Sequence, residues 1–304
     1  MRPSAKTRKE PIAFESEGVH ALYSPSRKDA RDALDTPYLG LSKPIHILVP
    51  DPNRRAHSKI VRSHVQTTPL PARYIVEVSP GIFAVTPELC FVQLCSELPT
   101  TKLLTIGFEL CGTYRINPLD QIGFSQAEAL CTPADIEKVA QSIASRGARR
   151  AERLTKYLIS GSASPMETAL ALILTLPVRY GGYGIPQPIM NMLVPVKAGQ
   201  GRGVDKHYYR CDLAWPEKGV AVEYDSDAFH TGSDRIAADA KRRNSLSYLG
   251  YHVITVGRQQ MKSGAALDMI AVQIAKQLGV RLRPRSQNWA DSRRRLREEL
   301  LSPF

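Results

Sequence analysis

The feature that most constrains the fold of this chain is a β-hairpin pattern in residues 207–230. Two runs rich in apolar residues flank the sequence Pro-Glu-Lys-Gly, whose composition is typical of a tight turn. With the turn centred on its Glu-Lys pair, Asp212 in the first strand faces Glu223 in the second. Residues opposed in this way have Cβ atoms about 4.5–5.5 Å apart, and like charges there destabilise a sheet. The hairpin therefore predicts a cation between the two carboxylates.

A third carboxylate comes from Glu167, at the start of a predicted helix. Ser164 at the N-cap, Pro165 at the first helical position and Glu167 at the third form a helix-start signature. Leu170 and Leu174 follow Glu167 at helical spacing and place it on the apolar face of the helix. Glu167 is therefore interpreted either as the acid of a capping box or as a third site residue, and it could serve as both.

Together, Glu167, Asp212 and Glu223 have the chemistry of a magnesium site. Their hard oxygen ligands suit Mg²⁺, or Mn²⁺ in its place, and Mg²⁺ keeps several waters for a phosphate substrate. Such an ion can activate a water and stabilise the leaving oxygen of a phosphodiester. The alternative is that the acidic pair of the hairpin is simply solvated on exposed strands.

The charge of the chain favours an anionic partner. Its 304 residues contain 41 lysines and arginines against 29 acidic residues, for a formal net charge of +12. Nucleic acid is the first candidate partner, and an anionic membrane surface is the second. The candidate contacts to a DNA backbone lie before, within and after the hairpin: Lys197, Arg202, Arg210, Arg242 and Arg243.

Cysteine usage and hydropathy predict a cytoplasmic protein without a membrane segment. The five cysteines form no Cys-x-x-Cys pair, so reduced thiols are expected and a zinc site is not. The N-terminus lacks the apolar region of a signal peptide. The most apolar run, residues 169–176, is too short to cross a bilayer.

Composition divides the chain into five segments. Residues 1–35 form a polar arm, and short strand patterns followed by helical ones at 36–130 predict a small α+β domain. The basic helical linker at 131–162 is interpreted as a solvated connecting helix or as a contact to the DNA backbone. An α/β domain is expected at 163–280 and a basic tail at 281–304. The expected strands are 44–50, 58–65, 72–78, 81–86, 189–196 and 251–257, and the expected helices include those at 100–111, 233–249 and 265–278.

The element order from residue 163 to residue 279 resembles that of the PD-(D/E)XK nuclease superfamily. It consists of an acid on a helix, a strand with Asp, a turn, a strand with Glu-x-Asp, a histidine, a basic helix, and one more strand and helix. The resemblance is closest to the branch whose core is similar to the very-short-patch mismatch repair endonuclease. The matching motifs are Ser164-Pro165-Met166-Glu167, Arg210-Cys211-Asp212-Leu213-Ala214-Trp215-Pro216, Val222-Glu223-Tyr224-Asp225, His230, and Asp239, Lys241 and Arg243 followed by Leu249-Gly250-Tyr251 and Val253.

This resemblance implies a fold and a set of site residues. The implied fold is a restriction-endonuclease-like mixed sheet flanked by helices, which here follows the small α+β domain. In the implied site, Asp212 and Glu223 bind the metal ion, and Glu167 completes the acidic cluster.

One departure from the superfamily pattern is Asp225, which stands where the motif has lysine. The missing lysine leaves activation of the water and neutralisation of charge without an assigned residue. Lys241 or His230 could supply the positive charge or handle the proton. The simpler interpretation of His230 is a hydrogen-bonded histidine at the end of a strand.

The N-terminal part bears a looser resemblance to another group of proteins. Residues 46–65 and 81–95 contain a strand, a basic turn, a second strand with His64, and a Val-Thr-Pro helix start. These pieces are similar to the region found ahead of such nuclease-like domains and in abortive-infection antitoxins of the type IV toxin–antitoxin class. The resemblance implies a regulatory or DNA-associated module and carries over no catalytic residue.

Three functions follow as hypotheses. The first is a Mg²⁺-dependent DNA endonuclease acting in DNA repair or phage defence. The second is a catalytically inactive nuclease-fold DNA-binding or antitoxin-like regulator, because the expected lysine is missing. The third is a protein-interaction module of a defence or mobile-element system, whose basic tail binds a partner; a homodimer stays open as well. Fold resemblance alone does not decide among them.

Overall fold

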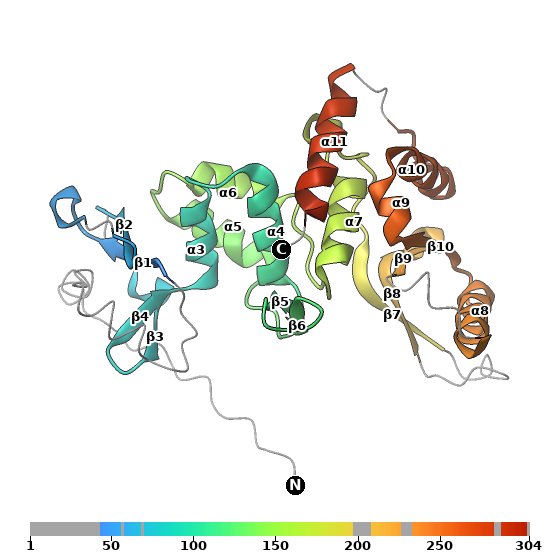
Figure 1. Cartoon of the computed structure of the whole chain (residues 1–304), viewed down its shortest axis with the longest axis horizontal. Helices are drawn as coiled ribbons and strands as arrows, with labels where there is room; N and C mark the ends of the chain where they lie inside the picture. Colours follow the sequence, from blue (N-terminus) through green and yellow to red (C-terminus); the bar gives the residue numbers. More distant parts are fainter. Residues whose placement is uncertain are drawn as a thin grey trace, which may run out of the picture. The chain divides into compact units, whose positions relative to one another are not determined.

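The computed structural model describes residues 43–55, 58–67, 70–196, 208–225, 233–282 and 287–302. The chain divides into two compact units, one of residues 1–90 with 142–145 and the other of residues 91–141 with 146–304. Figure 1 labels the helices and strands of both units. Helices and strands are mixed along the described chain, as the sequence predicts for an α/β protein. None of the described helices is both long and apolar enough to span a membrane.

The described part of the first unit contains two small sheets. β1 pairs with β2 in parallel, and β3 pairs with β4 in antiparallel orientation. β-Branched residues, which favour strands, recur in all four of these elements. The strands lie within or beside the ranges predicted from the sequence: β1 (Ile45–Val49), β2 (Val61–Val65), β3 (Ile75–Ser79) and β4 (Ile82–Val85), with the short 3-10 helices η1 (Pro52–Arg54) and η2 (Ala72–Tyr74) between them.

The elements between residues 87 and 155 are helical apart from one small hairpin. The predicted helix at 100–111 is confirmed, and the helical pattern of the predicted linker at 131–162 forms two helices. The hairpin of β5 and β6 has no counterpart among the elements predicted from the sequence. In chain order these elements are α3 (Pro87–Leu94), α4 (Thr100–Cys111), β5 (Tyr114–Ile116), β6 (Phe124–Gln126), α5 (Pro133–Ser142) and α6 (Ala148–Thr155).

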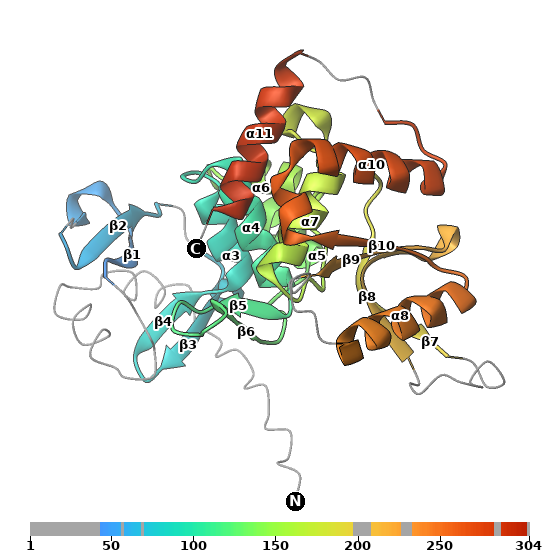
Figure 2. The ribbon, with the colours of Figure 1, turned by 45° about the vertical axis from the view of Figure 1, so that its right-hand side comes forward.

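A four-stranded mixed sheet with the order β10-β9-β8-β7 forms the core of the second unit. β7, β8 and β9 are antiparallel neighbours, and β10 runs parallel to β9 after the crossover helix α8. Helix α8 covers one face of the sheet, and α7 and α10 lie on the other (Figures 1 and 2). The elements are α7 (Pro165–Thr175), η3 (Val178–Tyr180), β7 (Ile189–Pro195), β8 (Tyr208–Trp215), β9 (Val220–Asp225), α8 (Ser233–Tyr248), β10 (His252–Gly257), α9 (Arg258–Lys262) and α10 (Gly264–Leu278).

The hairpin of β8 and β9 has the predicted turn and register. The turn is the 3-10 helix η4 (Pro216–Lys218), and Gly219 follows it with φ of 59°, in the left-handed region that favours glycine. The paired residues are Leu213 with Val222, Ala214 with Ala221, and Trp215 with Val220. These are three of the four predicted pairs. The pairing of β8 with β9 ends at Leu213, and Asp212 comes opposite Glu223 when the same register is continued by one residue.

The buried centre of the second unit is α7, in which residues 167–175 are all buried. Helix α11 (Gln287–Leu301), in the segment predicted as a basic tail, packs against α7. Its Trp289 is buried and donates a hydrogen bond through Nε1 to the carbonyl oxygen of Gly182, at 3.0 Å. This part of the tail is thus folded onto the core.

Candidate functional site

Polar residues from all four strands lie in one row across the sheet. Pairs on either side place Asn191 of β7 opposite Asp212 of β8. The hairpin register, continued by one residue, places Asp212 opposite Glu223 of β9, which in turn pairs with Thr255 of β10. This row crosses the sheet at the level of the predicted acidic pair.

Glu167 bonds the N-cap residue of α7, Ser164, and also contacts this row. Its amide donates to Ser164 Oγ at 3.2 Å, and Ser164 Oγ donates back to Oε1 of Glu167 at 3.0 Å. Oε2 accepts from the Ala163 amide at 2.9 Å and from Nδ2 of Asn191 at 2.6 Å. The Glu167 carboxylate therefore takes part in the start of α7, although it accepts from the amide of Ala163 and not from that of the N-cap residue Ser164, and it also reaches a side chain of the row.

Asn191 is a residue of this site that the sequence analysis missed. Its φ of 49° makes it the single non-glycine residue with positive φ in the described ranges, and asparagine tolerates that region better than most residues. Its Nδ2 also donates to the carbonyl oxygen of Gly161 at 2.8 Å. Its buried Oδ1 has no hydrogen-bond partner among the described groups. No sequence pattern marks an asparagine for this role, because the strand pairing brings it to Asp212.

Two substitutions of Asn191 are expected to distinguish the contribution of backbone strain to stability from that of the side-chain hydrogen bonds. Asn191→Gly and Asn191→Ala both remove the amide that donates to Glu167, so both should lower the free energy of unfolding. The alanine variant should lose about 1 kcal/mol more, because a Cβ without a compensating side-chain bond disfavours positive φ. Urea denaturation measures both values. Equal losses would contradict a left-handed conformation at this residue.

Asp212 is largely buried among negative charges. Burial, followed by the charges of Glu167 and Glu223, raises the pKa of Asp212 to about 7. The hydrogen bond from the Tyr224 amide to Oδ2, at 2.8 Å, and the charge of Arg242 act in the opposite direction. The site therefore has less positive charge than its carboxylates require.

Glu223 is paired with Arg242 from α8. Nε of Arg242 donates to Oε2 at 3.2 Å and Nη2 donates to Oε1, so both carboxylate oxygens are engaged. Nη2 also donates to the carbonyl oxygen of Arg210, at 2.5 Å. Although burial acts to lower it, the pKa of Arg242 is raised by its hydrogen bond to Glu223 and by the charge of that group. Arg242, which the sequence analysis grouped with DNA contacts, thus faces the acidic site.

The remaining predicted residues are spread around this centre. Lys241 and Arg243 flank Arg242 on α8 and are exposed, and Arg210 is exposed on β8. Asp225 is half-buried at the end of β9, where it pairs with Gly257. Lys197, Arg202 and His230, which the sequence predicts as DNA contacts or site residues, lie outside the described residues.

The side chains near Asp212 offer oxygen ligands of the kind that a divalent cation requires. In the part of the chain that the structure describes, no group of three or more His, Cys, Asp or Glu side chains is close enough to hold a metal ion. The oxygens of Glu167 and Glu223 are bonded to protein donors, whereas Oδ1 of Asn191 is a buried acceptor without a donor. The carboxylate and amide oxygens fit a hard cation in kind. The predicted metal site stays a prediction.

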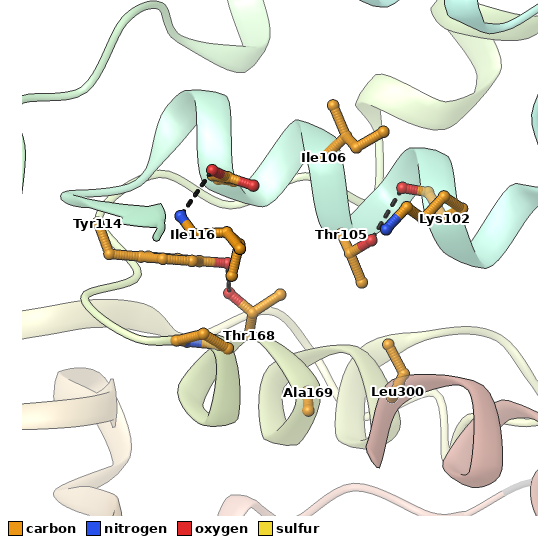
Figure 3. Close-up of a pocket in the computed structure, with 10 residues that line it drawn as sticks. Lys102, Thr105, Ile106, Tyr114, Ile116, Thr168, Ala169 and Leu300 are labelled. Atoms are coloured by element: carbon orange, nitrogen blue, oxygen red, sulfur yellow. Dashed lines mark hydrogen bonds between the residues drawn. The ribbon is translucent and has the colours of Figure 1, made fainter. Parts of the chain in front are cut away.

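A separate cavity of about 140 Å³ lies beside α4, β5 and α7 (Figure 3). The hydroxyls of Tyr114 and Thr168 are 3.0 Å apart at its wall, and burial raises the pKa of Tyr114 above its ordinary value. Ligand pockets usually measure about 300–1,000 Å³, so this cavity is too small for a nucleotide. None of the predicted site residues lines it.

Comparisons with known proteins identify two relatives. No protein-family model matches the chain, and no solved structure matches it significantly. The uncharacterized proteins Rv2248 of Mycobacterium tuberculosis strain H37Rv and MT2308 of strain CDC 1551 are each 26% identical to this chain over 127 residues. The match covers 41% of this chain and 42% of each relative. The likeness therefore spans less than half of the length of these relatives.

Proposed function

We propose that residues 163–280 form a metal-dependent DNA endonuclease domain of restriction-endonuclease-like fold, which hydrolyses phosphodiester bonds with an activated water. The observation that carries this proposal is the row of Asn191, Asp212 and Glu223 with Glu167 beside it. Burial, followed by the negative charges of Glu167 and Glu223, raises the pKa of Asp212 to about 7, and the charge of a bound divalent cation would act in the opposite direction. Mg²⁺ or Mn²⁺ fits these oxygen donors.

The order of the elements supports the same proposal. Helix α7 carries an acid and precedes the three antiparallel strands β7, β8 and β9, and α8 then leads to the parallel strand β10. This succession agrees with the order on which the resemblance to PD-(D/E)XK nucleases rests. The acids of that motif stand on α7, β8 and β9.

The proposed roles follow from the contacts of each side chain. Asp212, with Asn191 and Glu223 on either side, would be the central ligand. Glu223 would join it once Arg242 releases the carboxylate, and Glu167 orients Asn191 through their hydrogen bond. A divalent cation bound there would supply Lewis-acid chemistry, by activating a water and offsetting charge on the phosphate.

The basic residues around the site suit the backbone of a nucleic acid. Arg210, Lys241 and Arg243 are exposed near the acidic row, and the chain has a net charge of +12. Contacts of this kind hold DNA largely through its phosphates, so affinity should fall steeply with salt. These basic residues would position the DNA, and the acidic residues would hold the metal ion that activates the water.

A second candidate function is a DNA-binding regulator without catalysis. The pairing of both Glu223 oxygens with Arg242 favours this alternative, because the arginine already supplies a positive charge to the site. Asp225 in the place of the motif lysine points in the same direction.

The experiment that tests the proposed function compares wild type with Asp212→Asn on supercoiled plasmid DNA, with Mg²⁺, with Mn²⁺ and with EDTA. We expect the wild type to nick or linearise the plasmid when metal is present. The variant should be about a hundredfold slower or more, because the central ligand is lost. Negligible cutting by both proteins, with intact DNA binding, would favour the regulator instead.

A further inference from the structure

The side chain of Arg242 is more exposed than the Glu223 carboxylate with which it pairs. It is paired with Glu223 through two nitrogens, and the two side chains are 30% and 15% exposed, respectively. The guanidinium is therefore reachable from outside, while the carboxylate behind it is mostly covered. An arginine fork has the same two-point fit for a carboxylate and for a phosphate.

We propose that Arg242 is an exchangeable counter-ion, which passes from Glu223 to a backbone phosphate of DNA and so frees Glu223 for a divalent cation. This inference rests on the proposed function and assigns to Arg242 the binding of substrate phosphate. Without DNA, the guanidinium keeps the carboxylate neutralised. With DNA, the phosphate becomes its partner, and Glu223 adds its charge to that of Asp212.

The surroundings of Arg242 favour this exchange. Lys241 and Arg243 on either side are exposed, so a phosphate reaching Arg242 meets further positive charge. Release of Glu223 alone would leave a partly buried carboxylate near Asp212 and Glu167, an arrangement that is unfavourable without a cation. Phosphate binding and cation binding therefore assist each other, and the assistance is reciprocal because the two equilibria are linked.

The first experiment measures DNA binding in EDTA, where no metal takes part. A short fluorescein-labelled duplex is titrated with wild type, Glu223→Gln, Arg242→Gln and the double variant, and anisotropy is recorded. We expect Glu223→Gln to bind on the order of tenfold more tightly than wild type, because Arg242 is no longer held. We expect Arg242→Gln to bind more weakly, with a salt slope reduced by about one.

The double variant and two controls isolate the exchange from a general change of charge. If Arg242 carries the gain, Glu223→Gln in the Arg242→Gln background should not strengthen binding. Glu217→Gln, which removes an exposed acid from the same hairpin, and Arg258→Gln, which removes an exposed arginine at the start of α9, should each have a small effect. A gain from Glu223→Gln that persists without Arg242 would overturn the proposal.

The second experiment measures Mn²⁺ binding by calorimetry without activity as a readout. Arg242→Gln should bind Mn²⁺ on the order of tenfold more tightly than wild type, and the duplex should tighten binding to wild type by a similar factor. The duplex should have little effect on Mn²⁺ binding to Arg242→Gln. Arg242→Lys retains a charge but not the two-point fork, so its Mn²⁺ affinity without DNA should lie between those of wild type and Arg242→Gln. It also serves as a second variant in case Arg242→Gln fails to fold.

The two proposals fail in different ways. Equal Mn²⁺ affinity of wild type and Arg242→Gln would overturn the exchange and leave the metal site standing. No Mn²⁺ binding by any of these proteins, with or without DNA, would overturn the metal site and with it the proposed function. The metal-free DNA titration then still decides whether Arg242 moves from Glu223 to phosphate.

Discussion

In metal-free buffer at about pH 8, Asp212→Asn is expected to be more stable than the wild type by a few kcal/mol, although it should have lost cleavage activity. The reason is the raised pKa of the buried Asp212 carboxyl, at about 7 against an ordinary value of 3.8. Each pH unit between the folded and unfolded pKa corresponds to about 1.4 kcal/mol. Asparagine keeps the acceptor for the Tyr224 amide and removes the charge.

The stability advantage of Asp212→Asn over the wild type should increase with pH. Because the folded pKa lies above the unfolded one, the folded wild type holds more protons between them, and its stability falls as pH rises through this window. The loss begins near pH 4 and is complete above about pH 7. The advantage of Asp212→Asn should therefore be absent near pH 4 and fully developed near pH 8.

Thermal unfolding in EDTA at several pH values measures this difference. For domains of this size, each kcal/mol moves the midpoint by roughly 2–4 °C. Glu217→Gln, at an exposed position of the same hairpin, is the matched control and should change little at any pH. A constant difference between wild type and Asp212→Asn across the pH range would contradict a buried, repelled carboxyl.

Replacement of Gly219 by alanine is expected to destabilise the hairpin by about 2–5 kcal/mol. Its φ of 59° disfavours a side chain, and an added Cβ would lie 2.4 Å from the carbonyl oxygen of Gly250. That backbone cannot move aside easily, because the His252 amide donates to the carbonyl oxygen of Gly219 at 2.7 Å. The collision would therefore separate the start of β10 from the end of the turn.

Gly250→Ala is the matched control for Gly219→Ala. Gly250 also has positive φ, of 87°, but an added Cβ meets nothing within 4 Å. It should lose about 1–2 kcal/mol, from backbone strain alone. Urea denaturation measures the free energy of unfolding of both variants. The additional loss in Gly219→Ala is the contribution of the steric clash with the Gly250 carbonyl oxygen. Equal losses would show that the contact between the turn and Gly250 is not held in the folded protein.

The elements that the sequence predicted correctly are those governed by local rules. Ser164 caps α7 as expected, and the hairpin turn at residues 216–219 produces the expected register in β8 and β9. Gly279 ends α10 in the left-handed conformation expected of a helix stop. In each case the decisive contacts lie within a few residues, so the chain segment carries the information itself.

The elements that the sequence analysis missed depend on distant partners. The hairpin of β5 and β6 has strands of three residues, too short for a periodic pattern, and the hydroxyl of Tyr114 in β5 is hydrogen-bonded to that of Thr168 in α7. Asn191 has its role because β7 pairs with β8 and because Glu167 of α7 lies within hydrogen-bond distance. Such encounters leave no periodic signal in the sequence.

In the candidate site, the hairpin with Asp212 and Glu223 and the Ser164 cap beside Glu167 were predictable from the sequence, since turn geometry and helix capping are short-range. The choice of ionic and hydrogen-bonding partners depends on tertiary packing. This packing pairs Glu223 with Arg242, and it brings Asn191 within hydrogen-bond distance of Glu167. The physical reason is that α8 packs over the sheet with one orientation, and three adjacent basic residues point in different directions around a helix.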